Sequence, residues 1–367
     1  MFDFDVFVLG GGPAGLATAI AARRAGLTVM LADAEQPPID KACGEGLMPD
    51  SLRAAKRLGI EIPRDAGYEF QGIRFEGARH AAAAQFPYGR GLGLRRTVLQ
   101  PLLADAAANV GVDLHWRTPV TGIEANRIRF GKKAIEARWI IGADGSQSSV
   151  RRWAGIRFPN RRSSRFSYRR HYRIAPWSEF MEIHWNKGCQ FYVTPVSPAE
   201  ICVVLMTRTQ NQRIDEALPM FRALQRRLRL AEPISSERGA AAHTRRMARV
   251  TRGNVALIGD ASGTVDPITG EGLCLAFRQA TSLASALEAE DLSQYEKAHH
   301  QICRQARFMA RFMLLMDRST VIQTRTMAAF EKDPGLFSNL LAMHVGQLSP
   351  VHFAATAAVL GWDMVSA

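Results

Sequence analysis

Three glycines near the N-terminus have the spacing of a phosphate-binding turn: Gly10, Gly12 and Gly15. In such a turn the first glycine permits a tight bend, the second lets backbone amides approach a pyrophosphate, and the third lets a helix pack closely on the preceding strand. The N-terminus of that helix also attracts phosphate charge. Asp33, about twenty residues further on, can accept a hydrogen bond from a ribose hydroxyl. The pattern therefore predicts a dinucleotide site.

The residues around these glycines predict the elements that position them. An apolar run at 6–9 predicts a buried strand before the turn, and an Ala-rich segment at 16–25 predicts a helix after it. A second apolar run at 28–32 predicts another strand, which ends at Asp33. Strand, glycine turn, helix, strand and acid in this order are typical of a Rossmann-like unit.

Two further apolar runs also end in a turn that contains glycine and an acid. Residues 139–142 lead to Asp144 and Gly145, and residues 254–258 lead to the pair Gly259-Asp260. The carboxyl ends of neighbouring parallel strands meet at one edge of a sheet, where ligands bind. We therefore expect the three turns to converge and to hold one cofactor at three points.

Glycines elsewhere indicate close approach of the backbone to a flat ring. Gly270 and Gly272 precede an expected helix, whose N-terminus would stabilise negative charge on a bound ring. Gly44 and Glu45 lie in a turn-rich segment before a helix that we expect Asp50 to cap. Glu45 and Glu271 are either possible acids or residues that organise their loops.

Between the second and third glycine–acid turns the pattern changes to short alternating runs at 166–173, 180–185, 189–194 and 201–206. These runs predict an antiparallel meander, and one helix is expected over about 211–229. The last seventy-five residues or so are expected to be helical, with breaks near Pro334 and Pro350. We therefore predict an α/β protein with a three-layer, Rossmann-like nucleotide-binding domain (residues 1–70, 95–155 and 250–290), an interrupting antiparallel-sheet substrate domain (71–94 and 156–249) and a helical C-terminal segment (291–367).

The composition narrows the function classes. The 367 residues carry a net charge of +13, mostly from arginine, with 47% hydrophobic residues. A basic surface favours anionic partners, although a solvated surface without a partner explains it equally well. Five cysteines without Cys-x-x-Cys spacing indicate a reducing compartment rather than a disulfide framework. No apolar stretch reaches the ~20 residues of a transmembrane helix, so we expect a cytoplasmic protein.

Taken together, these motifs resemble those of the FAD-dependent oxidoreductases similar to p-hydroxybenzoate hydroxylase, a family of aromatic hydroxylases, geranylgeranyl reductases and flavin-dependent halogenases. The resemblance spans most of residues 1–290. It implies that the first turn holds the ADP pyrophosphate, that Asp33 holds the adenosine ribose, and that Gly259-Asp260 holds the ribityl chain. The resemblance also places Asp144-Gly145 near FAD and NAD(P)H, and Arg96 in contact with FAD. The expected cofactor site comprises Gly10, Gly12, Pro13, Ala14, Gly15, Asp33, Ala34, Gly44, Arg96, Asp144, Gly145, Gly259, Asp260, Pro267, Gly270, Glu271, Gly272 and Leu273.

The subgroup is decided by fewer residues. Ser262 stands where hydroxylases commonly have a histidine, and with the segment 43–47 it looks more like the geranylgeranyl-reductase branch. The reductase motif Tyr-x-Trp-x-Phe-Pro, however, is present only partly, at 191–195. The halogenase motif Trp-x-Trp-x-Ile-Pro is absent, and no lysine lies between Lys56 and Lys132, where the halogenase lysine would be expected.

The resemblance implies a flavoenzyme that NAD(P)H reduces transiently. The reduced enzyme would either activate oxygen to hydroxylate an aromatic or lipid-like substrate, or reduce an alkene. From the sequence we favour the monooxygenase, because the alternating, aromatic-rich meander suits a hydrophobic pocket. His184, Glu45 and Tyr192 are the candidate catalytic residues, and no metal is expected. A non-enzymatic basic flavoprotein is a further alternative, but the arginines lack the pattern of a nucleic-acid-binding motif.

The C-terminal segment carries three apolar sets, at 308–316, 336–343 and 351–362. One set is needed to dock the segment on the core. The remaining sets, with Arg304, Arg307, Arg311 and Arg318 beside them, predict a channel for a hydrophobic small molecule or a peripheral contact with anionic lipid.

Overall fold

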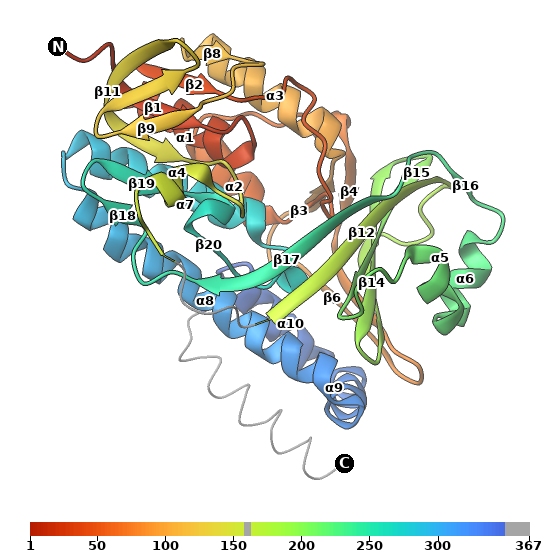
Figure 1. The fold of residues 1–367 in the computed structure, drawn as a ribbon. Helices are drawn as coiled ribbons and strands as arrows, with labels where there is room; N and C mark the ends of the chain where they lie inside the picture. The colour runs from red at the N-terminus through yellow and green to blue at the C-terminus, as the bar shows by residue number, and fades with distance from the viewer. Residues whose placement is uncertain (158–162, 349–367) are drawn as a thin grey trace.

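The computed structural model describes residues 1–157 and 163–348, which form two large sheets with helices around them (Figure 1). The first sheet has the strand order β18-β19-β11-β1-β2-β8, and its central strands are parallel. Its members are β1 (Phe4–Leu9), β2 (Val29–Ala32), β8 (Asp113–His115), β11 (Lys133–Gly142), β18 (Thr251–Arg252) and β19 (Val255–Leu257).

The register of this sheet brings its strand ends together. Leu9 at the end of β1 pairs with Ala32 of β2 and Gly142 of β11, and Gly142 pairs with Leu257 of β19. The carboxyl ends of four parallel strands therefore meet at one edge. The three predicted glycine–acid turns leave the sheet at this edge, so the Rossmann-like sheet predicted from the sequence is confirmed.

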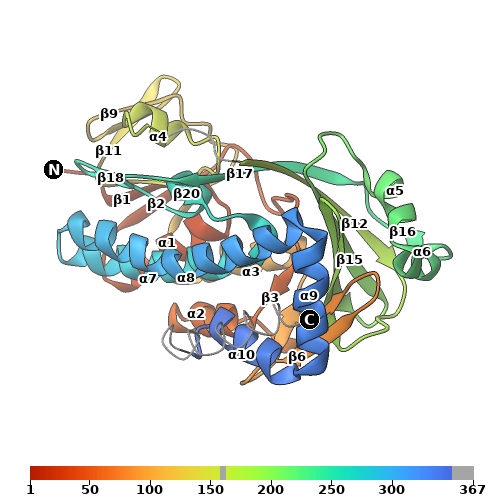
Figure 2. The same cartoon turned by 90° about the horizontal axis from the view of Figure 1, so that it is seen from below.

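The first sheet is the middle of three layers (Figure 2). The helices α1 (Pro13–Arg24), α3 (Arg96–Asn109) and α7 (Gly272–Glu288) lie on one face. On the other face lie α4 (Ser149–Trp153) and a hairpin of β9 and β10. In this hairpin β10 (Arg127–Phe130) pairs antiparallel with β9 (Gly122–Glu124), and its other edge pairs antiparallel with β11. The apolar run at 139–142 is the end of β11, which begins earlier, at Lys133.

The second sheet is mostly antiparallel, in the order β20-β17-β12-β15-β14-β13-β5-β6, with β16 paired to β12. The antiparallel pairing predicted for this region is confirmed, but only β13, β14 and β15 follow one another as a meander, because β12 pairs with β15 rather than with β13. The strands β5 and β6 from the first hundred residues extend the sheet beyond β13. Its members are β5 (Gly72–Glu76), β6 (Ala81–Gln85), β12 (Ser163–Arg173), β13 (Phe180–Asn186), β14 (Cys189–Ser197), β15 (Glu200–Thr207), β16 (Glu232–Pro233), β17 (Arg238–Arg246) and β20 (Gly263–Thr264). Three short strands form a separate sheet in the order β3-β7-β4: β3 (Gly46–Leu47), β4 (Tyr68–Phe70) and β7 (Gly91–Gly93).

Helices cover both faces of the second sheet. On one face α5 (Ile214–Ala217) and α6 (Arg222–Leu228) pack against residues such as Phe191. On the other face the C-terminal helices enclose what we call the apolar layer, a set of buried methionines and aromatic residues: Phe75, Met181, Trp185, Tyr192, Met309, Met313, Met316, Met327, Phe330 and Phe337. These helices are α8 (Leu292–Arg318), α9 (Thr320–Lys332) and α10 (Pro334–His344).

Three sequence expectations about helices are wrong. The helix expected over 211–229 is split into α5 and α6 by a 3-10 turn that contains Pro219. Asp50 does not cap α2 (Pro49–Arg57), because Pro49 starts the helix and Met48 is the capping residue. An additional break falls at Ser319, whose side chain caps α9 by accepting from the Ile322 amide. The break expected near Pro350 and the apolar set at 351–362 lie outside the described residues.

None of the helices in the described part of the chain is both long enough and apolar enough to cross a membrane.

Candidate cofactor site

The glycine turn after β1 has the geometry that its spacing predicts. Gly10 has φ +116°, and a Cβ there would lie 2.4 Å from the Ala143 carbonyl oxygen. A Cβ on Gly15 would lie 1.8 Å from the Gly10 carbonyl oxygen, so only glycine lets α1 start this close to the strand. A Cβ on Gly12 would instead meet a single atom, Arg96 Nη2, at 3.8 Å. The space in front of Gly12 is therefore open, with a guanidinium at its side.

Asp33 stabilises this turn directly. Its Oδ2 accepts from the Gly11 amide at 2.6 Å, and its Oδ1 accepts from the Glu35 amide at 2.8 Å. An ionised carboxylate has about four acceptor positions, so Asp33 retains capacity for the ribose hydroxyl that the sequence assigns to it. Ala34 beside it is exposed.

One residue at this turn was not predicted from the sequence. Gln100 of α3 is fully buried. Its Nε2 donates to the Gly11 carbonyl at 3.1 Å, and its Oε1 accepts from the Ile39 amide at 3.3 Å. Arg96, four residues earlier on the same helix, donates from Nε to the Ile39 carbonyl at 3.2 Å. The only signal for Gln100 in the sequence was a polar residue in an otherwise apolar part of the expected helix.

The second turn contains an unsatisfied carboxylate oxygen. Asp144 Oδ2 accepts from the amides of Ser149 and Val150 at the start of α4, at 2.6 and 3.2 Å. Asp144 Oδ1 is buried and has no hydrogen-bond partner among the described residues. Burying a charged oxygen without a donor is costly, so this atom indicates a donor that a bound group would supply. Gly145 beside it has φ +78° and open space where a Cβ would stand.

The third turn lies against the first. A Cβ on Gly259 would be 2.8 Å from the Ala14 Cβ at the start of α1, and the Gly259 amide donates to Gln279 Oε1 of α7 at 2.9 Å. Asp260 is accessible to solvent, yet the protein around it raises the pKa of its carboxyl by desolvation, an effect that Lys41 and Arg96 oppose. A side chain that is both accessible and enclosed by protein lies in a hollow. The Arg96 guanidinium therefore places positive charge both near Asp260 and beside the open space in front of Gly12.

The loop before α7 is fixed from the second sheet. Tyr192 donates its hydroxyl to the Ile268 carbonyl at 2.7 Å. Asp266 is buried, accepts from Thr244 Oγ1 at 2.9 Å and lies 3.4 Å from Arg165 Nε. Arg165 is also buried and makes an ion pair with Asp317 near the end of α8. The loop residues Pro267, Gly270, Gly272 and Leu273 are thus positioned by contacts that the sequence analysis missed.

Glu271 caps the start of α7 within this loop and is nine-tenths buried. Burial raises the pKa of its carboxyl, while His344 at the end of α10 lowers it. The two groups lie 3.7 Å apart, between Glu271 Oε2 and His344 Nδ1. Glu271 therefore links the expected cofactor loop to the C-terminal helices.

Glu45 is the centre of a buried charge network. It has φ +58°, a left-handed conformation that costs a non-glycine residue about 1 kcal/mol or more. Its Oε1 accepts from the Arg96 amide at 3.0 Å and from Arg169 Nη1 at 3.1 Å, and its Oε2 lies 2.6 Å from His171 Nε2. Arg169 Nη2 also donates to both carboxylate oxygens of Asp40. Both carboxylate oxygens of Glu45 thus contact protein groups, so we assign Glu45 the role of organising this network.

Three atoms of this network could hold a metal ion. The Glu45, His171 and Cys202 side chains are buried and their ligand atoms lie within 4.8 Å of one another. Arg169, however, already provides a cation to the Glu45 carboxylate, and a second cation there would be repelled. We therefore describe an ion-pair network rather than a metal centre.

The three catalytic candidates do not come together. Tyr192 belongs to the apolar layer and reaches the loop before α7. Glu45 lies near Arg96 on the cofactor side. His184 instead contacts Glu182 at 2.9 Å, and Glu182 in turn contacts Trp177. Trp177 packs with the apolar residues of α5 and α6, so His184 lies on the opposite face of the sheet from Tyr192.

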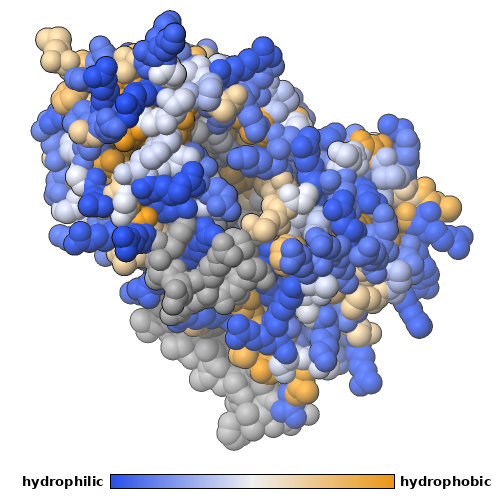
Figure 3. Space-filling model, viewed as in Figure 1, coloured by the Kyte–Doolittle hydropathy of each residue, from blue (hydrophilic) through white to orange (hydrophobic). Residues whose placement is uncertain are grey.

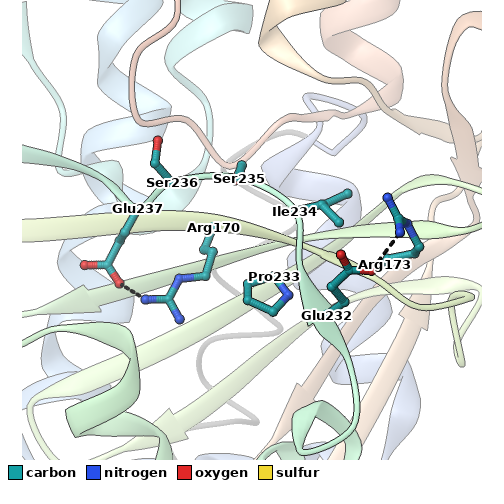
Figure 4. A pocket seen from close by; sticks show the side chains of 8 residues that line it. All are labelled: Arg170, Arg173, Glu232, Pro233, Ile234, Ser235, Ser236 and Glu237. Atoms are coloured by element: carbon teal, nitrogen blue, oxygen red, sulfur yellow. Dashed lines mark hydrogen bonds and ion pairs between the residues drawn. The ribbon is translucent and has the colours of Figure 1, made fainter.

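An open surface depression lies apart from these turns. It has a volume of about 740 Å³ and lies beside β12 and β16 (Figure 4). Its charged residues are paired with one another, Arg170 with Glu237 and Arg173 with Glu232. The space-filling view shows a mostly hydrophilic face with a recess between its upper-left and right-hand bodies (Figure 3).

The turns fit an FAD molecule. The space in front of Gly12, the unsatisfied oxygen of Asp144 and the hollow that contains Asp260 lie along the carboxyl edge of one sheet. A Cβ on Gly44 or on Gly272 would also meet no atom within 4 Å. The chain thus leaves room at Gly12, Gly44, Gly145 and Gly272, four of the glycines that the sequence assigns to the cofactor.

Comparisons with known proteins agree with this geometry. A family model described as FAD binding domain matches residues 3–306. Digeranylgeranylglycerophospholipid reductase 1 of Methanothermobacter thermautotrophicus is 27% identical over 342 residues, which cover 83% of each chain. Menaquinone reductase of Mycolicibacterium smegmatis is 25% identical over 323 residues, which cover 80% of this chain and 78% of the relative. The crystal structure of p-nitrophenol 4-monooxygenase from Pseudomonas putida has the same fold, with a TM-score of 0.78, 18% identity, and coverage of 94% of this chain and 99% of that one.

Proposed function

Because the chain belongs to the FAD binding domain family and is an FAD-dependent oxidoreductase, we propose that it reduces a carbon–carbon double bond in a long, isoprenoid-like lipid. The observation that carries this proposal is the apolar layer beside the loop before α7. Met309, Met313 and Met316 enter this layer from α8, and Tyr192 enters it from the second sheet.

Methionine suits an elongated apolar ligand, because its unbranched side chain adapts to irregular shapes. The layer also contains the rings of Phe75, Phe330 and Phe337, whose centroids lie 4.6 to 6.5 Å apart. Apolar surroundings of this kind favour a hydrocarbon chain over a charged substrate, which would have to be desolvated there.

The residues of this chain bind and orient, and FAD, when bound, supplies the two-electron chemistry. Gly12, Asp33 and Arg96 would hold the nucleotide half. Asp144 and Asp260 would hold the middle of the cofactor, and the loop that ends at Gly272 would hold its ring. Tyr192 fixes that loop, and burial raises the pKa of its phenol far above neutrality, so it remains a hydrogen-bond donor.

The curated relatives support reduction rather than oxygen insertion. Both are named as reductases, of digeranylgeranylglycerophospholipid and of menaquinone, and each aligns over about four-fifths of this chain. NAD(P)H is the proposed reductant. We expect it to dock transiently, because the sequence has no second Gly-x-Gly-x-x-Gly turn.

Hydroxylation of an aromatic substrate is the second candidate, and it was favoured by the sequence alone. The observation for it is the aromatic part of the apolar layer, where Phe75 packs edge-on against Trp185 with centroids 5.5 Å apart. Aromatic surroundings of this kind also suit an aromatic ring.

One experiment separates the two candidates. The FAD-loaded protein is incubated without oxygen with NAD(P)H and a detergent-solubilised geranylgeranyl lipid, and the product is analysed by mass spectrometry. Addition of two hydrogens supports reduction. A product that forms only with oxygen and contains an added oxygen atom supports hydroxylation instead.

A further inference from the structure

One side of α8 carries arginines and large apolar residues together. Arg304, Arg311, Leu315 and Arg318 are exposed, and their spacing of three to seven residues places them on one face of the helix. Figures 1 and 2 show α8 along the outside of the molecule. We call these four residues, with the half-buried Arg307, the α8 face.

The positive charge of this face is not neutralised. Arg304, Arg307, Arg311 and Arg318 have no ion-pair partner in the described ranges 1–157 and 163–348. Asp317 is the only acid between residues 301 and 330, and it is buried against Arg165 and Arg208. Like charges also lie close together here. The pKa of Arg307 is lowered mainly by burial and further by the positive charges of Arg246 and Arg311. An acid-free cluster of this kind attracts anions.

Large apolar side chains are exposed in the same region. Leu315 is 49% exposed, and Val321, just after the end of α8, is 61% exposed. A free phosphate or a nucleic-acid backbone would not require apolar side chains between the arginines. A bilayer surface does, because its headgroups bind arginine while the boundary of its acyl chains accepts apolar groups.

We propose that the α8 face docks on the surface of an anionic lipid bilayer without entering it as a spanning helix. The opposite side of α8 carries Met309, Met313 and Met316 into the apolar layer, and α8 packs against the 3-10 turn η4 (Pro267–Thr269) of the cofactor loop. One helix thus lies between the proposed lipid surface and the proposed substrate layer. Past this helix a lipid substrate would move from the bilayer to the apolar layer. This delivery rests on the proposed function, whereas docking of the α8 face does not.

The test is vesicle co-sedimentation of the FAD-loaded full chain. Vesicles of phosphatidylcholine alone are compared with vesicles that also contain phosphatidylglycerol. The test variant combines Arg304→Gln, Arg311→Gln and Arg318→Gln. The control combines Arg127→Gln, Lys132→Gln and Lys133→Gln, which removes the same charge from exposed positions of the β10–β11 hairpin.

The wild type and the control are expected to pellet with anionic vesicles only, and less so at high salt. Each basic residue near an anionic membrane contributes roughly fivefold to binding, so the α8 variant should bind on the order of a hundredfold more weakly. A further variant, Leu315→Ser with Val321→Ser, should weaken binding while keeping the salt dependence.

Equal binding by the wild type and the α8 variant would overturn the proposal. Equal binding of neutral and anionic vesicles, or none, would overturn it too. Retention of the wild type on duplex DNA but not on anionic vesicles, lost in the α8 variant, would assign the face to nucleic acid instead. Turnover of detergent-solubilised lipid by the α8 variant, measured in parallel, separates failure of docking from failure of the proposed reduction.

Discussion

The hydroxyl of Tyr192 lies 2.7 Å from the backbone carbonyl oxygen of Ile268 and donates a hydrogen bond to it. This contact joins the middle of the second sheet to the loop that begins α7, and both groups are buried. The sheet that forms one wall of the apolar layer therefore also fixes the loop expected to hold the ring of FAD.

Tyr192→Phe should loosen this loop without emptying the cofactor site. The Ile268 carbonyl would be buried without its donor, which costs about 1 to 3 kcal/mol. We expect normal FAD content, a reduction potential that differs from the wild type, and a lower kcat for the lipid substrate. Loss of FAD would show instead that Tyr192 supports the nucleotide turns.

Two glycine-to-alanine variants should separate folding from cofactor binding. Gly15→Ala would place a Cβ 1.8 Å from the Gly10 carbonyl oxygen, so the turn must distort and the apoprotein should unfold at a lower temperature. Gly12→Ala should leave thermal unfolding of the apoprotein unchanged and weaken FAD binding, because its methyl group projects only into the open space beside Arg96. Differential scanning fluorimetry and FAD titration of the apoprotein measure the two effects. Full FAD affinity in Gly12→Ala would mean that the phosphate lies elsewhere.

Glu45→Gln should destabilise the fold strongly. The substitution leaves Arg169 and His171 buried without the full charge of their partner, and breaking a buried ion pair in this way costs about 3 to 5 kcal/mol. Glu124→Gln is the matched control, because the exposed Glu124–Arg129 pair should contribute at most about 1 kcal/mol. Urea unfolding compares them. A stable Glu45→Gln protein that has lost only activity would restore Glu45 as a catalytic candidate.

His299 should make stability depend on pH. It is buried beside Ser262 Oγ at 2.9 Å, and desolvation, assisted by Arg307 and His300, lowers its pKa from 6.5 to about 3. The unfolded chain therefore binds a proton that the folded chain excludes. The full contribution to stability is present above pH 6.5 and is lost as the pH falls toward 3, at up to about 1.4 kcal/mol per pH unit.

The control for this prediction is His299→Gln, which keeps a polar group near Ser262. The difference in unfolding free energy between the wild type and this variant should change between pH 6.5 and pH 4.5. The carboxylates are the same in both proteins, so their contribution to the pH dependence cancels in this difference. A constant difference over this interval would contradict the assignment of a buried, neutral His299.

Local patterns were sufficient to predict the nucleotide turns but not the residues that hold them. The glycines at 10, 12 and 15 and the acids that follow the strands are close in sequence, so their spacing carries the geometry. Gln100, by contrast, contacts Gly11 across 89 residues, and Arg165 contacts Asp317 across 152. Such partners are set by the packing of distant elements, which no local period reveals.

The choice among catalytic candidates was limited in another way. Alternation along β13 places His184 and Ile183 on opposite faces of the sheet, but both faces are covered by helices and both are buried. Hydrophobic period alone therefore could not identify the face that adjoins the cofactor. The structure distinguishes them, because Ile183 packs with the apolar layer, to which Tyr192 belongs, while His184 contacts Glu182 on the other side.

The central claim, reduction of an isoprenoid double bond, is tested most directly by anaerobic stoichiometry. The FAD-loaded protein, NAD(P)H and a geranylgeranyl lipid are mixed with oxygen removed, and consumed NAD(P)H is compared with double bonds lost. We predict one NAD(P)H consumed per double bond reduced, at a rate unchanged when oxygen is readmitted. No loss of double bonds without oxygen, with NAD(P)H oxidation and an oxygenated product when oxygen is present, would contradict the account.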